Sequence, residues 1–201
     1  MKEKLGLPLL LMVLLALTRW PGLLPQNFSA VYGLLFCAGV YFPKRLAWWL
    51  PLATILFTDL LINWHYGVAL INGYTLVNYA VYLLILWLGR RFSPKASFMS
   101  LLGGGLLSAI LFYFITNTAS WLQNPEYAKT LAGWLQALTI GTAGWPHTWE
   151  FFRNTLLSGG MFTGLFAGAM KLAAAAEPQE EAETEPASAD EAEPEPEESK
   201  A

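Results

Sequence analysis

The feature that most constrains the fold of this chain is a series of six long apolar runs, separated by gaps that hold most of its cations. Apolar runs of this length are typical of helices that cross a lipid bilayer. The pattern therefore predicts an all-α membrane protein built as a bundle of six transmembrane helices. The expected crossings are Leu5–Trp20, Phe28–Phe42, Leu46–Trp64, Tyr74–Gly89, Phe98–Thr118 and Phe152–Ala173.

The cations are distributed unevenly between the gaps. Those on one side of the expected bundle are Lys2, Lys4, Lys44, Arg45, Arg90, Arg91 and Lys95, with Lys171 at the end of the last run. The opposite connections hold only Lys129, with Arg19 and Arg153 at the edges of runs. Because cytoplasmic loops are enriched in Lys and Arg, we expect a multi-pass membrane protein with both termini in the cytoplasm.

The end of the chain has a different composition. Eleven of the fifteen acidic residues lie between Glu177 and Glu198, in a segment rich in Pro, Ala and Ser that has no large apolar side chain. Such a segment cannot bury enough apolar surface to offset the entropy lost on ordering. We therefore expect a six-helix transmembrane domain over residues 1–176 and a disordered acidic cytoplasmic tail over residues 177–201.

Polar side chains within the runs are concentrated in the halves expected to face outward. Unpaired polar groups are costly in lipid, so these groups must face one another, water or a ligand. An outward-facing pocket for a small solute would satisfy them, with Arg19 and Asp59 recognising charge and Tyr113 and Trp121 stacking on a flat ligand. The alternative is a structural clamp between Arg19 and Asp59, with asparagines that cross-link helices. The expected pocket residues are Arg19, Asp59, Asn63, Asn78, Tyr113, Asn117, Trp121, Arg153 and Asn154.

The connection from Ala119 to Glu150 is long and rich in Trp and Tyr. Its apolar stretch Leu131–Ile140 predicts a helix that lies on the bilayer surface. The connection could act as a lid over an outer pocket or as an interfacial anchor, and the sequence leaves both open.

Few residues could support catalysis or metal binding. Cys37 is the only cysteine, and His65 and His147 lack the neighbours of a metal site. Ser158 lies beside glycines but outside any Gly-x-Ser-x-Gly motif, and the chain has no P-loop. We expect no enzymatic activity, no metal or other cofactor, and no nucleic-acid partner.

Three motifs in the C-terminal half carry a resemblance to a known family. They are Phe112–Thr118 followed by Trp121, Tyr127–Leu131 followed by Gly133, and Pro146-His147 followed by Arg153-Asn154-Thr155. In these motifs the chain resembles a bacterial family of uncharacterised proteins assigned to transport, which is similar to the S components of energy-coupling factor (ECF) transporters. The resemblance implies a six-helix bundle that binds a vitamin or similar small molecule from outside. It also implies a transmembrane coupling protein and cytoplasmic ATPases as partners.

One departure from S components bears on these partners. S components often carry small residues at AxxxA spacing on the first helix, where the coupling protein docks, whereas Leu9 to Leu17 is bulky except for Ala16. Action without partners therefore stays open. The alternative function is that of a structural or adaptor membrane subunit whose acidic tail binds a cytosolic partner.

Overall fold

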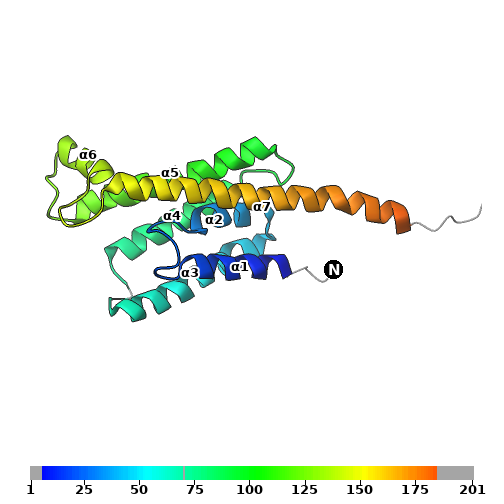
Figure 1. Ribbon diagram of the computed structural model, residues 1–201, viewed down its shortest axis with the longest axis horizontal. Helices are drawn as coiled ribbons and strands as arrows, with labels where there is room; N and C mark the ends of the chain where they lie inside the picture. Colours follow the sequence, from blue (N-terminus) through cyan, green and yellow to red (C-terminus); the bar gives the residue numbers. More distant parts are fainter. Residues whose placement is uncertain (1–5, 70, 185–201) are drawn as a thin grey trace, which may run out of the picture. The chain divides into compact units, whose positions relative to one another are not determined.

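The regular structure of the chain is helical throughout the residues described by the computed structural model, which are 6–69 and 71–184 (Figure 1). These residues fall into two compact units that divide after Gly168. The helices are α1 (Gly6–Thr18), α2 (Val31–Tyr41), α3 (Lys44–Tyr66), α4 (Gly73–Gly89), α5 (Phe98–Gln123), α6 (Leu131–Thr139) and α7 (Thr148–Thr184).

A helix occurs at each of the six expected runs, and α6 occupies the apolar stretch of the long connection. Three helices are long and apolar enough to cross a bilayer by themselves: α3, α5 and the part of α7 from Thr148 to Ala175. The other three runs form shorter apolar helices, of 13, 11 and 17 residues in α1, α2 and α4.

Local sequence signals explain where several helices begin and end. Asn72 caps α4 in a capping box with Thr75, whose backbone N–H donates to Asn72 Oδ1 at 3.0 Å. Ser97 caps α5 in the same manner, accepting from the backbone N–H of Ser100 at 3.2 Å. Helix α3 ends at Tyr66 and is capped by Gly67, whose φ of 63° is left-handed and therefore suits glycine.

Helix α2 lies at the centre of the first unit. Every residue from Val31 to Val40 is buried, as expected for a helix that is apolar on all sides. It packs against α4 and α5. It also lies close to α7, because a β-carbon on Gly33 would lie 2.8 Å from the backbone nitrogen of Thr163 and 3.0 Å from the carbonyl oxygen of Gly159.

The glycines of α5 and α7 also serve packing within the first unit. A β-carbon on Gly160 would meet Leu106 of α5 at 3.1 Å, and one on Gly159 would meet Ala109 at 2.8 Å. Small residues thus allow α7 to lie directly against α5 along the stretch that precedes Gly168.

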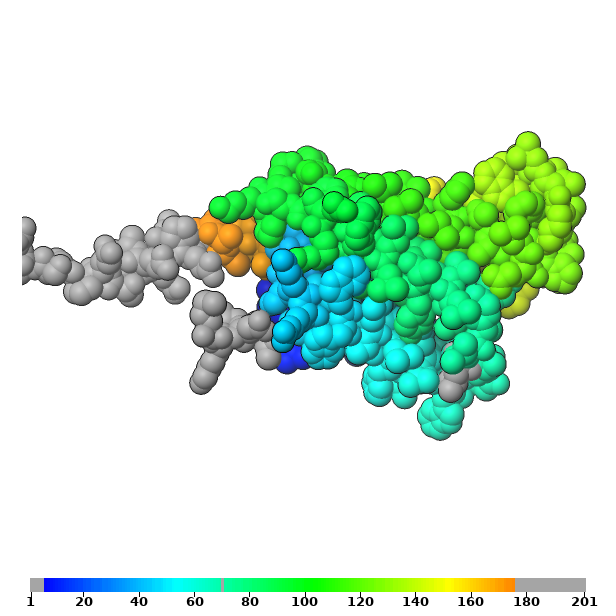
Figure 2. Space-filling view, turned by 180° about the vertical axis from the view of Figure 1, so that it is seen from behind, coloured from blue at the N-terminus to red at the C-terminus, as the bar shows by residue number. Residues whose placement is uncertain are grey.

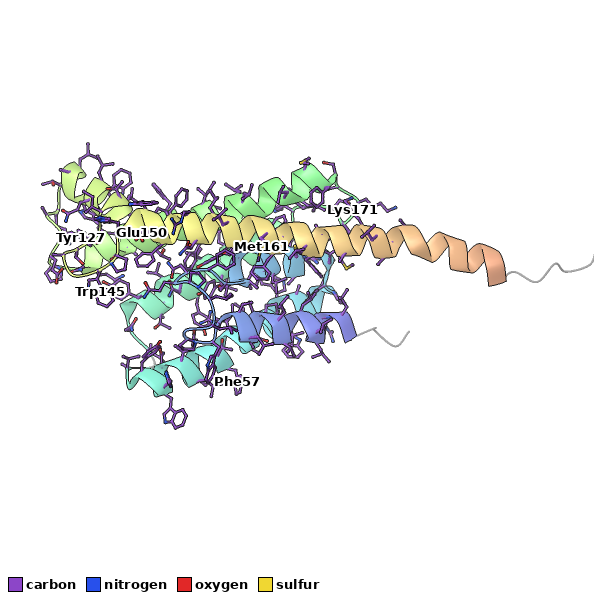
Figure 3. All side chains as sticks on the ribbon, viewed as in Figure 1. Phe57, Tyr127, Trp145, Glu150, Met161 and Lys171 are labelled. Atoms are coloured by element: carbon purple, nitrogen blue, oxygen red, sulfur yellow. The ribbon has the colours of Figure 1, made fainter. Side chains whose placement is uncertain are left out.

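Large apolar side chains cover the outer faces of α1 and α3. Leu10 and Leu17 of α1 are exposed, as are Phe57 and Trp64 of α3 (Phe57 is labelled in Figure 3). Apolar surface of this extent is unusual on a soluble monomer and is the normal surface of a helix in lipid. Figure 2 shows the connection from α5 to α7 gathered at one end of the first unit.

The second unit continues α7 beyond Ala169 as far as Thr184. Helix α7 therefore extends past residue 177, where the expected tail begins. The remainder of that tail, residues 185–201, lies outside the described residues.

Candidate binding pocket

A hollow of about 340 Å³ lies where the connection between α1 and α2 meets α3, α4 and α5. We call it the α1–α2 hollow. Most of its wall comes from the connection itself, residues 19–30, and the rest comes from single side chains of the surrounding helices. Those helix residues are Thr18, Val31, Tyr32, Ile62, Tyr66, Asn78, Tyr82 and Phe112.

The connection folds back on the end of α1. The backbone N–H of Ala30 donates to Thr18 Oγ1 at 3.1 Å, and the Thr18 hydroxyl donates to the carbonyl of Leu15 at 3.0 Å. Two left-handed residues, Gly22 with a φ of 79° and Asn27 with a φ of 59°, make the turns. The two ends of the connection are thus joined, and the residues between them form a compact loop with polar backbone and side-chain groups.

An ion pair lies beside the hollow. Arg19 Nη2 donates to Asp59 Oδ1, and the side chains are 13% and 25% exposed. The second carboxylate oxygen, Oδ2, accepts from the hydroxyl of Tyr79 at 3.0 Å. The clamp between Arg19 and Asp59 therefore exists, and it coexists with a hollow that Arg19 lines.

Asp59 borders a different space from its partner. It lines a groove of about 260 Å³ between α3 and α4, together with Leu56, Leu60 and Tyr79, and we call this the α3–α4 groove. Arg19 is not among the residues that line this groove, and Asp59 is not among those that line the α1–α2 hollow. The pair is therefore oriented, with its cation toward the hollow and its anion toward the groove.

Aromatic rings form much of the inner wall of the hollow. The ring of Phe112 lies 4.7 Å from that of Tyr32 and 5.8 Å from that of Tyr82, centroid to centroid. The rings of Phe112 and Tyr82 are nearly parallel, at an interplanar angle of 4°. A ligand in the hollow would meet a polar loop on one side and this aromatic wall on the other.

The structure brings some of the expected pocket residues to the hollow. Arg19 and Asn78 line it, whereas Asp59 pairs with Arg19 without lining it. Asn154 does not line the hollow, but its Nδ2 donates to the carbonyl of Gln26 at 2.9 Å and so holds the loop that forms the wall.

Two further expected residues lie elsewhere. Arg153 stacks over the Trp149 ring, with its guanidinium carbon 5.5 Å from the ring centroid. Asn63 is in the last turn of α3, where its backbone carbonyl accepts from Val68 at 3.0 Å, and it does not line the hollow.

Tyr113, Asn117 and Trp121 do not line the hollow either. The Tyr113 hydroxyl donates to the carbonyl of Leu138 at the end of α6, and Trp121 Nε1 donates to the carbonyl of Ala128 at 2.8 Å. Asn117 Nδ2 donates to the carbonyl of Tyr113 within α5 at 2.8 Å. Tyr113 therefore binds the backbone of α6, and Trp121 binds the backbone of the connection that precedes α6.

The motif around residues 127–133 has the same structural role. Thr130 caps α6 through the N–H of Gly133, and Lys129 Nζ donates to the carbonyl of Asn124 at 2.7 Å and to that of Trp121, where a cation suits the C-terminus of α5. Tyr127 is buried, and burial together with the nearby Glu126 raises the pKa of its phenol.

Most of the residues that line the hollow are not predicted by the sequence. Tyr32, Tyr82 and Phe112 are ordinary members of apolar runs, and only the positions of three different helices make them neighbours. One local signal for the loop that lines the hollow is the polar pair Gln26-Asn27, which separates two apolar runs. Among the described residues, no group of three His, Cys, Asp or Glu side chains could hold a metal ion.

Fold and hollow together define the class: an all-helical protein with three helices long and apolar enough to span a membrane. The chain belongs to the family of unknown function DUF6580, whose sequence model matches residues 1–182. No curated protein and no solved structure matches the chain.

Proposed function

We propose that the protein is a multi-pass integral membrane protein that binds a small solute in the α1–α2 hollow. The observation that carries the proposal is the hollow itself, because its volume of about 340 Å³ suits a small ligand and its wall combines polar groups with aromatic rings. Such a composition is typical of ligand pockets and unusual between packed membrane helices.

The placement of charge supports an outward-facing hollow. The hollow lies at the start of α2, and the cations Lys44 and Arg90 line a separate cavity at the end of α2. Arg90 Nη1 donates to the carbonyls of Gly39 and Phe42, at 3.3 Å each. By the positive-inside rule the end with Lys44 and Arg90 faces the cytoplasm, so the hollow faces outside, the termini are cytoplasmic and six segments cross.

The hydrogen bonds of Lys129 are consistent with this orientation. It is the one cation in the middle of a connection assigned to the outside, and its ammonium group binds the backbone carbonyls of Trp121 and Asn124. Its presence at that end is therefore explained by capping of α5.

The proposed role is that of a substrate-binding component for uptake, similar to an ECF S component, in the bacterial cytoplasmic membrane. The resemblance in the motifs of the C-terminal half supports it. The partners would then be a transmembrane coupling protein and cytoplasmic ATPases. The exposed bulky side chains of α1, such as Leu10 and Val13, argue against docking through small residues on that helix, so a coupling protein would need another surface.

The test is whether filling the hollow abolishes solute binding. Ser29→Trp would place a ring in the hollow, and Ser93→Trp is the matched control in the connection between α4 and α5. A panel of small organic acids, bases and neutral rings is screened by thermal shift of the purified protein. We expect some solutes to raise the Tm of the wild type and of Ser93→Trp but not of Ser29→Trp. If no solute separates the two variants, the proposal is wrong.

A further inference from the structure

The charge that lines the α1–α2 hollow is positive, among the described residues. Among the described residues that line it, Arg19 is the only one with a full charge at neutral pH. The others carry amides, hydroxyls, aromatic rings or aliphatic groups. A ligand in the hollow would therefore meet one cationic group and no carboxylate.

Asp59, the counter-ion of Arg19, does not cancel the positive charge at the hollow. Both oxygens of Asp59 are occupied, Oδ1 by Arg19 and Oδ2 by the hydroxyl of Tyr79. The carboxylate borders the α3–α4 groove on the far side of the pair. Because the cation is the nearer of the two charges, the potential in the hollow is positive, and a low-dielectric wall strengthens it.

Arg19 also has an unused donor. Its Nε atom is buried and has no hydrogen-bond partner among the described residues. Buried donors without a partner are rare in folded proteins because they lose their bonds to water and gain none. The guanidinium therefore has spare donor capacity, and a carboxylate that meets the 13% of the side chain left exposed would form a charge-assisted bond.

The remaining wall sets the size and shape of the ligand. The rings of Tyr32, Tyr82 and Phe112 line the hollow and offer an apolar surface to a ring-sized body. A volume of about 340 Å³ is near the lower end of the range for small-molecule pockets. We infer that the α1–α2 hollow selects small aromatic monocarboxylates, with Arg19 binding the carboxylate and the aromatic wall binding the ring.

This inference rests on the proposed function and narrows the class of solute. It is tested with three probes of nearly the same shape: benzoate, benzamide and benzamidinium, which are anionic, neutral and cationic. Binding of each radiolabelled probe to the protein in lipid nanodiscs is measured by equilibrium dialysis, with empty nanodiscs as the blank for partition into lipid. We expect benzoate to bind at least about 10-fold more tightly than benzamide, as one charge-assisted hydrogen bond implies, and benzamidinium to bind least.

The variants isolate the role of Arg19. The double change Arg19→Gln with Asp59→Asn removes both charges of the pair, so no unpaired charge is left behind. It should abolish the preference for benzoate over benzamide. Arg19→Lys keeps the cation but loses Nε, and we expect it to retain part of the preference. The control is Arg91→Gln, because Arg91 lies over the Trp87 ring of α4 and does not line the hollow.

Each other result overturns the inference in a distinct way. If benzamide or benzamidinium binds as tightly as benzoate, the charge selection is refuted while solute binding stands. If benzoate binds preferentially but the double variant keeps the preference, Arg19 is not the anion site. If none of the three probes binds the wild type, the assigned class of ligand is wrong, and the panel with Ser29→Trp then decides the proposed function separately.

Discussion

The side-chain amide of Asn154 in α7 donates to the backbone carbonyl of Gln26, which lies 128 positions earlier in the chain, at 2.9 Å. This bond joins the loop that forms the wall of the α1–α2 hollow to a helix made of the last run. It means that the shape of the hollow depends on α7 although, among the described residues, no α7 side chain lines it.

Replacing Asn154 should therefore loosen the loop. In Asn154→Ala the carbonyl of Gln26 loses its partner, and the N–H groups of Leu23 and Phe28, which donate to Trp20 and Pro25 within the loop, should exchange faster with deuterium. Loss of one partly exposed hydrogen bond should cost about 1 kcal/mol of stability.

The control for this change is Asn117→Ala, which removes an amide that donates within its own helix. It should leave exchange in residues 22–29 unchanged. Equal exchange in both variants, measured by mass spectrometry, would show that Asn154 does not hold the loop.

The Arg19–Asp59 pair should show strong coupling. Either single change, Arg19→Gln or Asp59→Asn, leaves a partly buried charge without its partner and should cost about 3 kcal/mol. The double variant should be more stable than the sum of the single effects implies. Unfolding of all four proteins in detergent gives the coupling energy, and additive effects would show that the pair contributes nothing as a pair.

The contact between α2 and α7 should tolerate no added methyl group. In Gly33→Ala the new β-carbon would meet backbone atoms of Gly159 and Thr163, which cannot move aside as a side chain can. We expect a loss of about 1–3 kcal/mol. Gly103→Ala is the control, because a β-carbon there would meet nothing within 4 Å, and its Tm should stay equal or rise. A Gly33→Ala protein as stable as the control would refute the close approach.

The helices were more predictable from the sequence than the site. Apolar runs and capping residues such as Asn72 and Ser97 are local signals, so each helix is found near its expected range. The hollow depends on which helices are neighbours, and nothing in the apolar run around Phe112 predicts that its ring lies beside those of Tyr32 and Tyr82. Of the residues expected from the sequence, Arg19 and Asn78 line the hollow and Asp59 pairs with Arg19, since polar groups within apolar runs must find partners.

Position along a helix does not distinguish a side chain of the hollow from one that binds a neighbouring backbone. Tyr113 and Trp121 are expected in the pocket, but their polar atoms bind the backbone carbonyls of Leu138 and Ala128. Sequence position gives the level of a residue along a helix and leaves its direction around the helix open. That direction decides whether the side chain faces the hollow or the segment between α5 and α7.

The hydroxyl of Tyr113 should hold α6 against α5. Tyr113→Phe keeps the ring but leaves the carbonyl of Leu138 without this donor, so limited proteolysis should cut the exposed residues 143–147 faster. Tyr74→Phe, at an exposed position, should be cut at the wild-type rate. Identical cleavage of the two variants would contradict this anchoring role.

The proposed orientation can be checked with single cysteines. Cys37 is buried and is the only native cysteine, so it should not react with an impermeant maleimide in the folded protein. Glu126→Cys should be labelled from outside intact cells, and Lys95→Cys only after the membrane is opened. Labelling of both positions in intact cells, or of Lys95→Cys alone, would refute the assigned orientation.

The burial of α2 has a consequence for biogenesis. At eleven residues the helix is about 17 Å long, roughly half the hydrocarbon thickness of a bilayer. Of the helices that surround it, α3, α4, α5 and α7 are synthesised after it and only α1 before it, so a newly made α2 is not yet enclosed. We therefore expect this segment to be retained by the insertion machinery until translation of the last helix completes the enclosure.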